Sequence, residues 1–280
     1  MHIDAYYNGI FSNKKDIKIP LTDRAVFFGD GIYDAAIGRN GKIFMLKEHI
    51  DRFLSNAKAV DIPFCMDREK LKLTLERLAR NSRYECFFLY FQLSRYSKER
   101  IHAYPETKLS NLLITITPIA IPNPKKKLTL TLAEDIRHSM CNIKTLNLIP
   151  AVLASHNADA LGKDETVLVR DETVTECAHS NIHIIKNSKL ITHPLDNFIL
   201  PGISRMHLIK VCKKNGIEII ERKFGTNELF AADEVIVTST SKLAMRVKSI
   251  DKTEYRLENN SIGSKLCDIM HSEFMEFTNK

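Results

Sequence analysis

The chain has 280 residues, of which 44% are hydrophobic and 27% charged, proportions typical of a folded protein with a substantial buried core. Its formal net charge of +7 comes from 41 basic and 34 acidic residues. The basic residues are scattered apart from the run Lys125–Lys127, so we expect no nucleic-acid partner. No stretch approaches the roughly 18 apolar residues of a membrane span, and the N-terminus does not resemble a signal peptide, so we expect no membrane association.

The six cysteines lie far apart in the sequence, and none belongs to a closely spaced pair. This spacing argues against a zinc site or a disulfide framework, and we predict no metal site. Unpaired cysteines are typical of a reducing compartment, so we expect a cytoplasmic protein.

The first hundred residues predict a mixture of short strands and helices. The pair Asn40–Gly41 separates apolar runs over 32–37 and 43–46, and this pattern predicts a β-hairpin. Apolar residues then recur at helical spacing over 47–60. A second helix is predicted over 67–80, with its first residue, an aspartate, as the N-cap.

Two nearly continuous apolar runs, 86–93 and 111–117, predict buried strands. Prolines and three consecutive lysines then break the pattern, and we interpret residues 119–127 as a linker. Beyond it, strands are predicted near 128–132, 165–169, 182–185 and 234–238, and helices near 148–161, 203–214 and 264–278. The simplest architecture is therefore two α+β lobes, formed by residues 1–118 and 128–280.

One lysine, Lys144, lies between a β-rich run and a predicted helix. Further along the chain comes Glu176, followed by Ser180 and Asn181. A lysine amine can form a Schiff base with a cofactor aldehyde and then move a substrate proton, and a carboxylate against a pyridine nitrogen keeps that nitrogen protonated. A lysine with a carboxylate and hydroxyl groups further along is what pyridoxal phosphate chemistry requires.

A third segment suits the phosphate of such a cofactor. Leu200 and the Pro-Gly pair after it lead into the helix predicted from residue 203. The free N–H groups and partial positive charge of a helix N-terminus favour a phosphate. Here Ile203 can offer its backbone N–H, and Ser204 can add its hydroxyl.

The segments around Lys144 and Glu176 resemble those of the fold-type IV aminotransferases, which depend on pyridoxal 5'-phosphate. Within that family the chain is most similar to the D-amino-acid aminotransferases, from about residue 7 to about residue 247. The resemblance implies an α+β fold with a smaller N-terminal lobe and a larger C-terminal lobe that has a β-barrel-like core.

The resemblance also implies roles for individual residues. Lys144 would hold the cofactor and move the proton, and Glu176 would protonate the ring. Arg52 matches an arginine in an HxxR helix motif that pairs with the phosphate, and Thr240 matches a second phosphate loop. The implied cofactor-binding set is Arg52, Lys144, Glu176, Ser180, Asn181, Leu200, Ile203, Ser204 and Thr240.

The substrate site is implied by two further motifs. Phe28–Asp34 resembles the family motif FGDGxYE, with aspartate in place of glutamate, and Arg100 and His102 form an Arg-x-His pair. In the D-amino-acid aminotransferases, a tyrosine of the first motif and an Arg-x-His pair from the partner subunit bind the substrate α-carboxylate. The equivalent tyrosine here is Tyr33. The chain is therefore expected to form a homodimer that transfers the amino group of a D-amino acid such as D-alanine to 2-oxoglutarate, giving D-glutamate by a ping-pong mechanism.

Some positions depart from the family pattern, and alternatives stay open. His179 replaces a small residue, and Lys242 and Arg246 could shape the side-chain pocket toward acidic substrates. A branched-chain L-amino-acid aminotransferase would share Lys144 and Glu176 but lack the Arg-x-His pair. An aminodeoxychorismate lyase would release pyruvate without a keto-acid acceptor, and a catalytically silent homologue would bind the cofactor without turnover.

Overall fold

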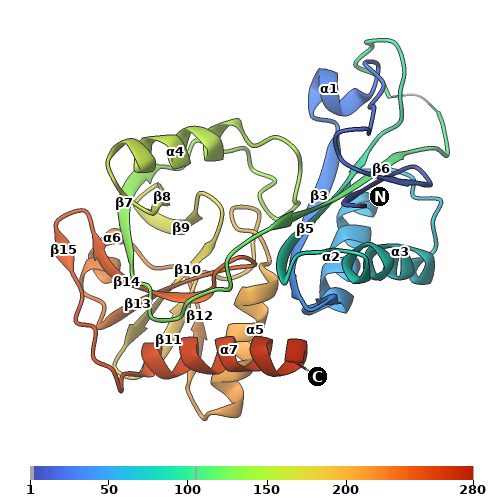
Figure 1. The fold of residues 1–280 in the computed structure, drawn as a ribbon. Coiled ribbons are helices and arrows are strands. Elements are labelled where there is room, and N and C mark those ends of the chain that lie inside the picture. Colours follow the sequence, from blue (N-terminus) through green and yellow to red (C-terminus); the bar gives the residue numbers. More distant parts are fainter. Residues whose placement is uncertain (1–2, 105, 280) are drawn as a thin grey trace. The chain divides into compact units, whose positions relative to one another are not determined.

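The computed structural model describes residues 3–104 and 106–279, over which the chain has a mixed α+β fold (Figure 1). Contacts between residues separate two compact units. The first unit comprises Met1–Ile121, Ile143–Asn147 and Glu276–Lys280, and the second comprises Pro122–Asn142 and Leu148–Met275. The two predicted lobes and their linker stay a prediction, because contacts do not show whether either part folds alone.

The first unit is built on an antiparallel sheet with the strand order β2-β1-β6-β5-β3-β4. Its strands are β1 (Ala5–Tyr7), β2 (Ile10–Ser12), β3 (Gly31–Arg39), β4 (Lys42–Ile43), β5 (Cys86–Ser94) and β6 (Asn111–Pro118). Asn40 and Gly41 join β3 to β4 with φ of 51° and 75°, which confirms the predicted hairpin. The strand predicted over 43–46 is wrong beyond residue 43, because Met45 is left-handed, with φ of 52°, and begins a helix.

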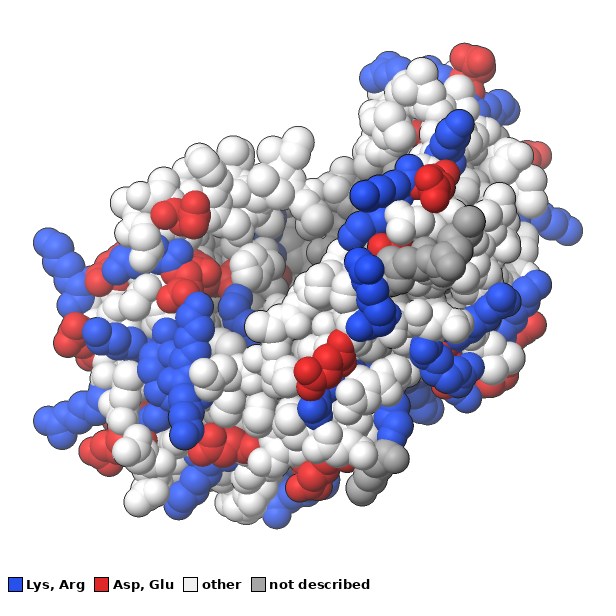
Figure 2. All heavy atoms as spheres, in the orientation of Figure 1, with Lys and Arg blue, Asp and Glu red and all other residues white. Residues whose placement is uncertain are grey.

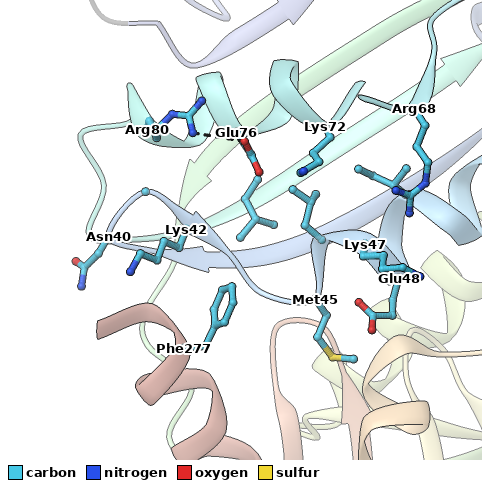
Figure 3. A pocket seen from close by; sticks show the side chains of 14 residues that line it. Asn40, Lys42, Met45, Lys47, Glu48, Arg68, Lys72, Glu76, Arg80 and Phe277 are labelled. Atoms are coloured by element: carbon cyan, nitrogen blue, oxygen red, sulfur yellow. Dashed lines mark hydrogen bonds and ion pairs between the residues drawn. The ribbon is translucent and has the colours of Figure 1, made fainter. Parts of the chain in front are cut away.

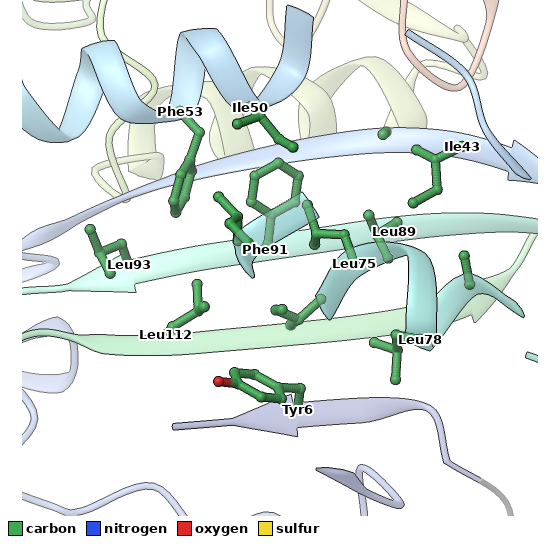
Figure 4. Packing of buried hydrophobic residues seen from close by; sticks show 14 of the residues in the cluster. Tyr6, Ile43, Ile50, Phe53, Leu75, Leu78, Leu89, Phe91, Leu93 and Leu112 are labelled. Atoms are coloured by element: carbon green, nitrogen blue, oxygen red, sulfur yellow. The ribbon is translucent and has the colours of Figure 1, made fainter. Parts of the chain in front are cut away.

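Helices α2 (Leu46–Ala59) and α3 (Arg68–Arg80) pack on this sheet, and the short helix α1 (Arg24–Phe28) precedes β3. Phe53 of α2 and Leu75 of α3 are fully buried in one cluster with Phe91 of β5 (Figure 4). The side chain of Asp67 accepts a hydrogen bond from the backbone N–H of Lys70 at 2.7 Å, which confirms the predicted N-cap.

The second unit contains a sheet with the strand order β12-β11-β10-β13-β14-β7-β8-β9, and β15 pairs with β14. Its strands are β7 (Leu128–Glu134), β8 (Glu165–Arg170), β9 (Thr173–Cys177), β10 (Asn181–Lys186), β11 (Lys189–Thr192), β12 (Ile219–Glu221), β13 (Glu234–Ser239), β14 (Leu243–Ile250) and β15 (Thr253–Glu254). Val174 of β9 and Ile191 of β11 lie near opposite ends of this order yet belong to one buried cluster. The sheet therefore curls around its own core, as the predicted β-barrel-like lobe requires.

The helices of the second unit are α4 (Ile149–Ala160), α5 (Ile203–Lys214), α6 (Thr226–Phe230) and most of α7 (Ile262–Asn279). Leu208 of α5 and Leu266 of α7 are fully buried in a second cluster with Ile236 of β13. None of the helices in the described part of the chain combines the length and the apolar character needed to cross a membrane.

A buried histidine in β10 gives this unit a testable pH dependence. His183 is fully buried, and its two ring nitrogens lie 2.9 Å from the hydroxyls of Thr192 and Thr238. Burial, with a smaller contribution from the charge of Arg205, lowers the pKa of His183 from 6.5 to about 3. The folded chain therefore keeps His183 neutral at pH values where the unfolded chain protonates it.

The free energy of unfolding is thus expected to decrease as the pH falls from about 6.5 toward 3, by at most about 1.4 kcal/mol per pH unit for this one group. Urea unfolding at pH 5, 6 and 7 measures the slope. His183→Asn should reduce this slope by up to about one proton, leaving the shares of His49 and His193, whose pKa values are also lowered by burial. Equal slopes in the wild-type chain and the variant would contradict this assignment.

Candidate active site

Lys144 lies in a segment that pairs with the start of β3. The backbone N–H of Tyr33 donates to the carbonyl of Lys144 at 2.9 Å, and that of Leu146 donates to the carbonyl of Gly31 at 3.1 Å. A Cβ atom on Gly31 would lie 2.7 Å from the backbone carbonyl oxygen of Leu93, which belongs to the paired strand β5, so only glycine permits this close approach. The pairing fixes the backbone of Lys144 relative to the first motif of the substrate site.

The amine of Lys144 contacts the predicted substrate-binding tyrosine. Lys144 Nζ donates to Tyr33 Oη at 3.1 Å and lies 4.3 Å from the centre of the Tyr33 ring. The Tyr33 ring in turn stacks on Tyr90, with ring centres 5.4 Å apart. Both tyrosines belong to strands of the sheet, so the half-buried Lys144 has an ordered setting.

Arg52 belongs to a buried charge cluster that also explains Asp34. Both oxygens of Asp34 accept from Arg52, at 2.8 Å each, and Oδ1 also lies 2.7 Å from His49 Nδ1. Burial alone would raise the pKa of Asp34, but Arg52 and His49 outweigh it and hold that pKa well below its usual range. The histidine and arginine of the HxxR motif thus meet the acidic residue of the FGDGxYD motif. A phosphate would have to approach Arg52 from the side not used by Asp34.

Arg100 and His102 gather around a different aromatic residue. The Arg100 guanidinium lies 5.1 Å from the centre of the Phe28 ring, and the His102 ring lies 5.2 Å from it. Both side chains are exposed, and within the described residues neither hydrogen-bonds Tyr33 or Lys144. The trap predicted from Tyr33, Arg100 and His102 stays a prediction, since it requires a second subunit.

In the second unit, Glu176 is a buried carboxylate with several donors. Its Oε1 accepts from Arg137 Nη1 at 2.5 Å, and its Oε2 accepts from Asn181 Nδ2 at 2.8 Å and from the backbone N–H of Leu200 at 3.0 Å. Asn181 and Leu200, predicted as cofactor contacts, therefore orient Glu176. These donors favour the ionised carboxylate that a protonated pyridine nitrogen needs.

Arg137 is a functional candidate that the sequence did not identify. Besides Glu176, it donates to both oxygens of Asp135 at 2.9 Å each and to the carbonyl of Phe198 at 3.0 Å. Burial would lower the pKa of Arg137, but Asp135 and Glu176 outweigh it and raise that pKa above its usual range. The only hint in the sequence was the Asp-Ile-Arg tripeptide shortly before Lys144. Because Arg137 and Glu176 are 39 residues apart, no local pattern predicts their contact.

The N-terminus of α5 has the features of an anion site. Helix α5 begins at Ile203, and its N-cap, Gly202, has no side chain that could accept from the first N–H groups. A Cβ atom on Gly202 would clash with the side chain of Asn181, so glycine is required there. Ser204 is buried within the first turn. Uncapped N–H groups beside a hydroxyl fit a phosphate.

A second candidate for a phosphate contact lies at the end of β13. Ser239 Oγ is buried and has no hydrogen-bond partner within the described residues, and it directly precedes Thr240. A buried hydroxyl without a partner is costly unless a ligand satisfies it. Ser239 therefore joins Thr240 as a candidate, although the sequence pointed only to Thr240.

Lys242 and Arg246, which were expected to favour acidic substrates, both contact groups of the protein, and that expectation stays a prediction. Lys242 Nζ donates to the fully buried Glu165 at 2.6 Å, and Ser180 Oγ and His179 Nδ1 lie 2.8 and 3.2 Å from the same oxygen. Arg246 is 2% exposed and donates to the carbonyl of Glu258. Both cations already neutralise or bind groups of the protein. Ser180 contacts Glu165 as well, so its role as a cofactor ligand stays a prediction.

A separate pocket of about 640 Å³ lies in the first unit (Figure 3). Its apolar side chains include Ile43 and Phe277, and its lining includes Lys and Arg side chains. Arg80 pairs with Glu76 at 3.4 Å, and Arg68 with Asp51 at 2.5 Å. Lysines and arginines are likewise interspersed with acidic residues over the face seen in Figure 2. Neither Lys144 nor Tyr33 lines this pocket, so it is distinct from the candidate active site.

Residues 31–250 match the amino-transferase class IV family. The chain belongs to this family, and it is therefore an aminotransferase that acts on amino acids and keto acids. It is 36% identical over 249 residues to a D-alanine aminotransferase of Listeria monocytogenes, a match that covers 87% of this chain and 86% of that relative. It is 35% identical over 250 residues to a D-alanine aminotransferase of Staphylococcus epidermidis, covering 88% of each.

Solved structures with the same fold include branched-chain aminotransferases as well. A branched-chain aminotransferase from Thermoproteus uzoniensis has a TM-score of 0.89 at 21% identity, covering 99% of this chain and 97% of that one. A branched-chain amino acid aminotransferase from Escherichia coli has a TM-score of 0.85 at 19% identity, covering 99% of this chain and 95% of that one. At these identities the likeness shows the fold alone, which confirms the fold-type IV architecture.

Proposed function

We propose that the chain is a pyridoxal-phosphate-dependent transaminase of D-amino acids, with D-alanine as a typical donor and 2-oxoglutarate as the acceptor that becomes D-glutamate. The contact between Lys144 and Tyr33 carries the proposal, because it joins the catalytic amine to the first motif of the substrate site. Identities of 35 to 36% with D-alanine aminotransferases support the D-preference.

The residues present fit the cofactor, which when bound supplies an aldehyde for the amine and a ring that withdraws electrons from the substrate Cα. Lys144 Nζ would hold it and then carry a proton to and from Cα. Tyr33 Oη accepts from Nζ and so restricts where the amine points. Glu176, which accepts from Arg137, would hold the proton on the ring nitrogen.

Each unit taken by itself offers groups suited to the phosphate. In the second unit, the uncapped N-terminus of α5 offers the N–H groups of Ile203 and Ser204, and Ser239 offers its unpaired hydroxyl. Thr240 adds a hydroxyl beside Ser239. In the first unit, Arg52 offers a positive charge that Asp34 holds in place.

We further propose that the substrate carboxylate is bound by Arg100 and His102 of a partner subunit in a homodimer. The exposed side of α4 supports an interface: Ile149, Val152 and Leu153 recur at helical spacing and are 75, 60 and 51% exposed. Exposed apolar stripes of this kind are typical of surfaces that another protein covers. A second copy of the chain is the partner that would supply Arg100 and His102.

Val152→Glu is expected to dissociate this homodimer, because it places an unpaired carboxylate in an apolar interface. Analytical ultracentrifugation should show a dissociation constant raised by at least about 100-fold, equivalent to about 2.7 kcal/mol. Leu73→Glu is a matched control, since Leu73 is 56% exposed on α3 of the first unit. A Val152→Glu chain that sediments as the wild type would contradict the assigned interface.

The proposed function is tested by the near-visible absorbance of the purified protein with pyridoxal phosphate, before and after D-alanine is added without acceptor. Conversion of the bound cofactor to its amino form by D-alanine, and not by L-alanine or L-leucine, is expected. Conversion by L-leucine alone would indicate a branched-chain L-amino-acid aminotransferase. Repeated release of pyruvate from aminodeoxychorismate without a keto-acid acceptor would indicate a lyase. A cofactor that binds but is not converted by any of these substrates would indicate a catalytically silent homologue.

A further inference from the structure

Arg24 is a buried arginine whose guanidinium contacts the backbone that carries the Arg-x-His pair. It is 3% exposed. Its Nη1 donates to the carbonyl of Ile101 at 2.6 Å and its Nη2 to the carbonyl of His102 at 3.1 Å. Its Nε donates to Asp30 at 2.7 Å. One side chain thus connects helix α1 to a segment 77 and 78 residues further along the chain.

The carboxylate that holds Arg24 is itself fixed by a second arginine. Arg95 Nε lies 3.0 Å from Asp30 Oδ2, and its other nitrogens donate to the carbonyls of Val60 and Asp61. The charge of Arg24 is therefore partly balanced by a carboxylate that cannot easily move. A guanidinium held on one edge presents its remaining N–H groups in a fixed direction.

Phe28 supports the side chains of Arg100 and His102, whereas Arg24 supports the backbone of their segment. Arg24 lies 4.7 Å from the centre of its ring, Arg100 lies 5.1 Å from it, and the His102 ring packs at 5.2 Å and a tilt of 51°. Residues 99–104 are otherwise exposed. Tyr104, at the end of this segment, lies over the Arg95 guanidinium at 3.9 Å. The part that carries Arg100 and His102 would sample many conformations without Arg24 and Phe28.

We propose that Arg24 and Phe28 are positioning residues that hold Arg100 and His102 in the orientation that binds the substrate α-carboxylate. The inference rests on the proposed function, since it assigns the supports of the same carboxylate trap. Neither residue needs to touch the substrate. Their effect is preorganisation: the loop is ordered before substrate arrives, so binding does not have to order it.

The first test is Arg24→Lys in the holoenzyme. A lysine keeps the positive charge beside Asp30, but it lacks the planar fork that contacts Asp30 and two carbonyls together. We expect the KM for D-alanine to rise at least about tenfold, the effect of losing one charge-assisted hydrogen bond, with kcat and the cofactor absorbance little changed. Arg77→Lys is a matched control, because Arg77 stacks on Phe11 at 4.2 Å in the same unit.

A second readout does not depend on activity. Trypsin cleavage after Lys98 and Arg100 should become at least several-fold faster in Arg24→Lys and in Phe28→Leu, while cleavage in the control follows the wild type. Unchanged KM and unchanged cleavage in both variants would overturn the proposal. So would an equal loss of kcat, cofactor absorbance and thermal stability, which indicates a general structural role. If the wild type converts no D-amino acid, the proposed function fails, and cleavage alone then reports whether the supports exist.

Discussion

Lys144→Ala is expected to abolish transamination of D-alanine, with a fall in kcat of at least about 10³-fold. The substitution removes both the amine that would hold the cofactor and the base that would move the Cα proton, and a positioned general base alone contributes roughly 10² to 10⁴. Stopped-flow absorbance of the cofactor with D-alanine measures the half-reaction directly. The variant should still fold, because the backbone pairing of Lys144 with β3 does not involve its side chain.

Lys58→Ala is the appropriate control for Lys144→Ala, since Lys58 is an exposed lysine of α2 in the same unit. It should leave kcat and circular dichroism unchanged. An active Lys144→Ala variant would refute the catalytic assignment. An unfolded variant would show instead that the fold requires the contact between the Lys144 amine and Tyr33.

Arg137→Gln is expected to destabilise the chain by about 3 to 5 kcal/mol, the cost of leaving buried carboxylates without their cation. Asp135 and Glu176 are 5% exposed each, and both bind Arg137. Urea unfolding measures the loss. The cofactor absorbance should also respond, because Glu176 would lose the cation that holds it and would support the ring nitrogen less.

The surface pair of Arg222 and Glu228 is a matched comparison. Arg222 donates to both oxygens of Glu228, at 2.9 and 2.6 Å, but both side chains are exposed. Arg222→Gln should therefore cost less than about 1 kcal/mol. If the loss comes from buried carboxylates without their cation, the double variant Arg137→Gln, Asp135→Asn should recover part of the stability. Similar losses in Arg137→Gln and Arg222→Gln would contradict this explanation.

Local periodicity was sufficient to predict most elements of the fold. The predicted helices and the strands outside the hairpin agree with the structure to within two residues, because apolar spacing and the cap at Asp67 are local signals. Strand β14 escaped prediction, since its buried Arg246 is an unusual residue for a central strand. The carbonyl of Glu258 that binds Arg246 lies in another segment, so no local pattern could reveal that the charge is satisfied.

The sequence predicted which residues form the candidate site, but it did not predict which of them contact one another. Lys144 and Tyr33 were both candidates from the sequence. Because 111 residues separate them, no local pattern predicts their hydrogen bond. Arg24 and Arg137 were overlooked because a buried arginine has no sequence signature apart from its partners. The contact of Lys242 was overlooked for the same reason, since its partner Glu165 lies 77 residues away.

The assignment of Ile143–Asn147 and Glu276–Lys280 to the first unit has a consequence for synthesis on the ribosome. The backbone passes from one unit to the other four times, and Phe277 packs on Phe44 with ring centres 5.6 Å apart. The first unit therefore cannot gain all its native contacts until residues 276–280, which are translated long after Ile121, have left the exit tunnel. An N-terminal fragment ending near residue 121 should accordingly be a substrate for chaperones rather than an independent folding intermediate.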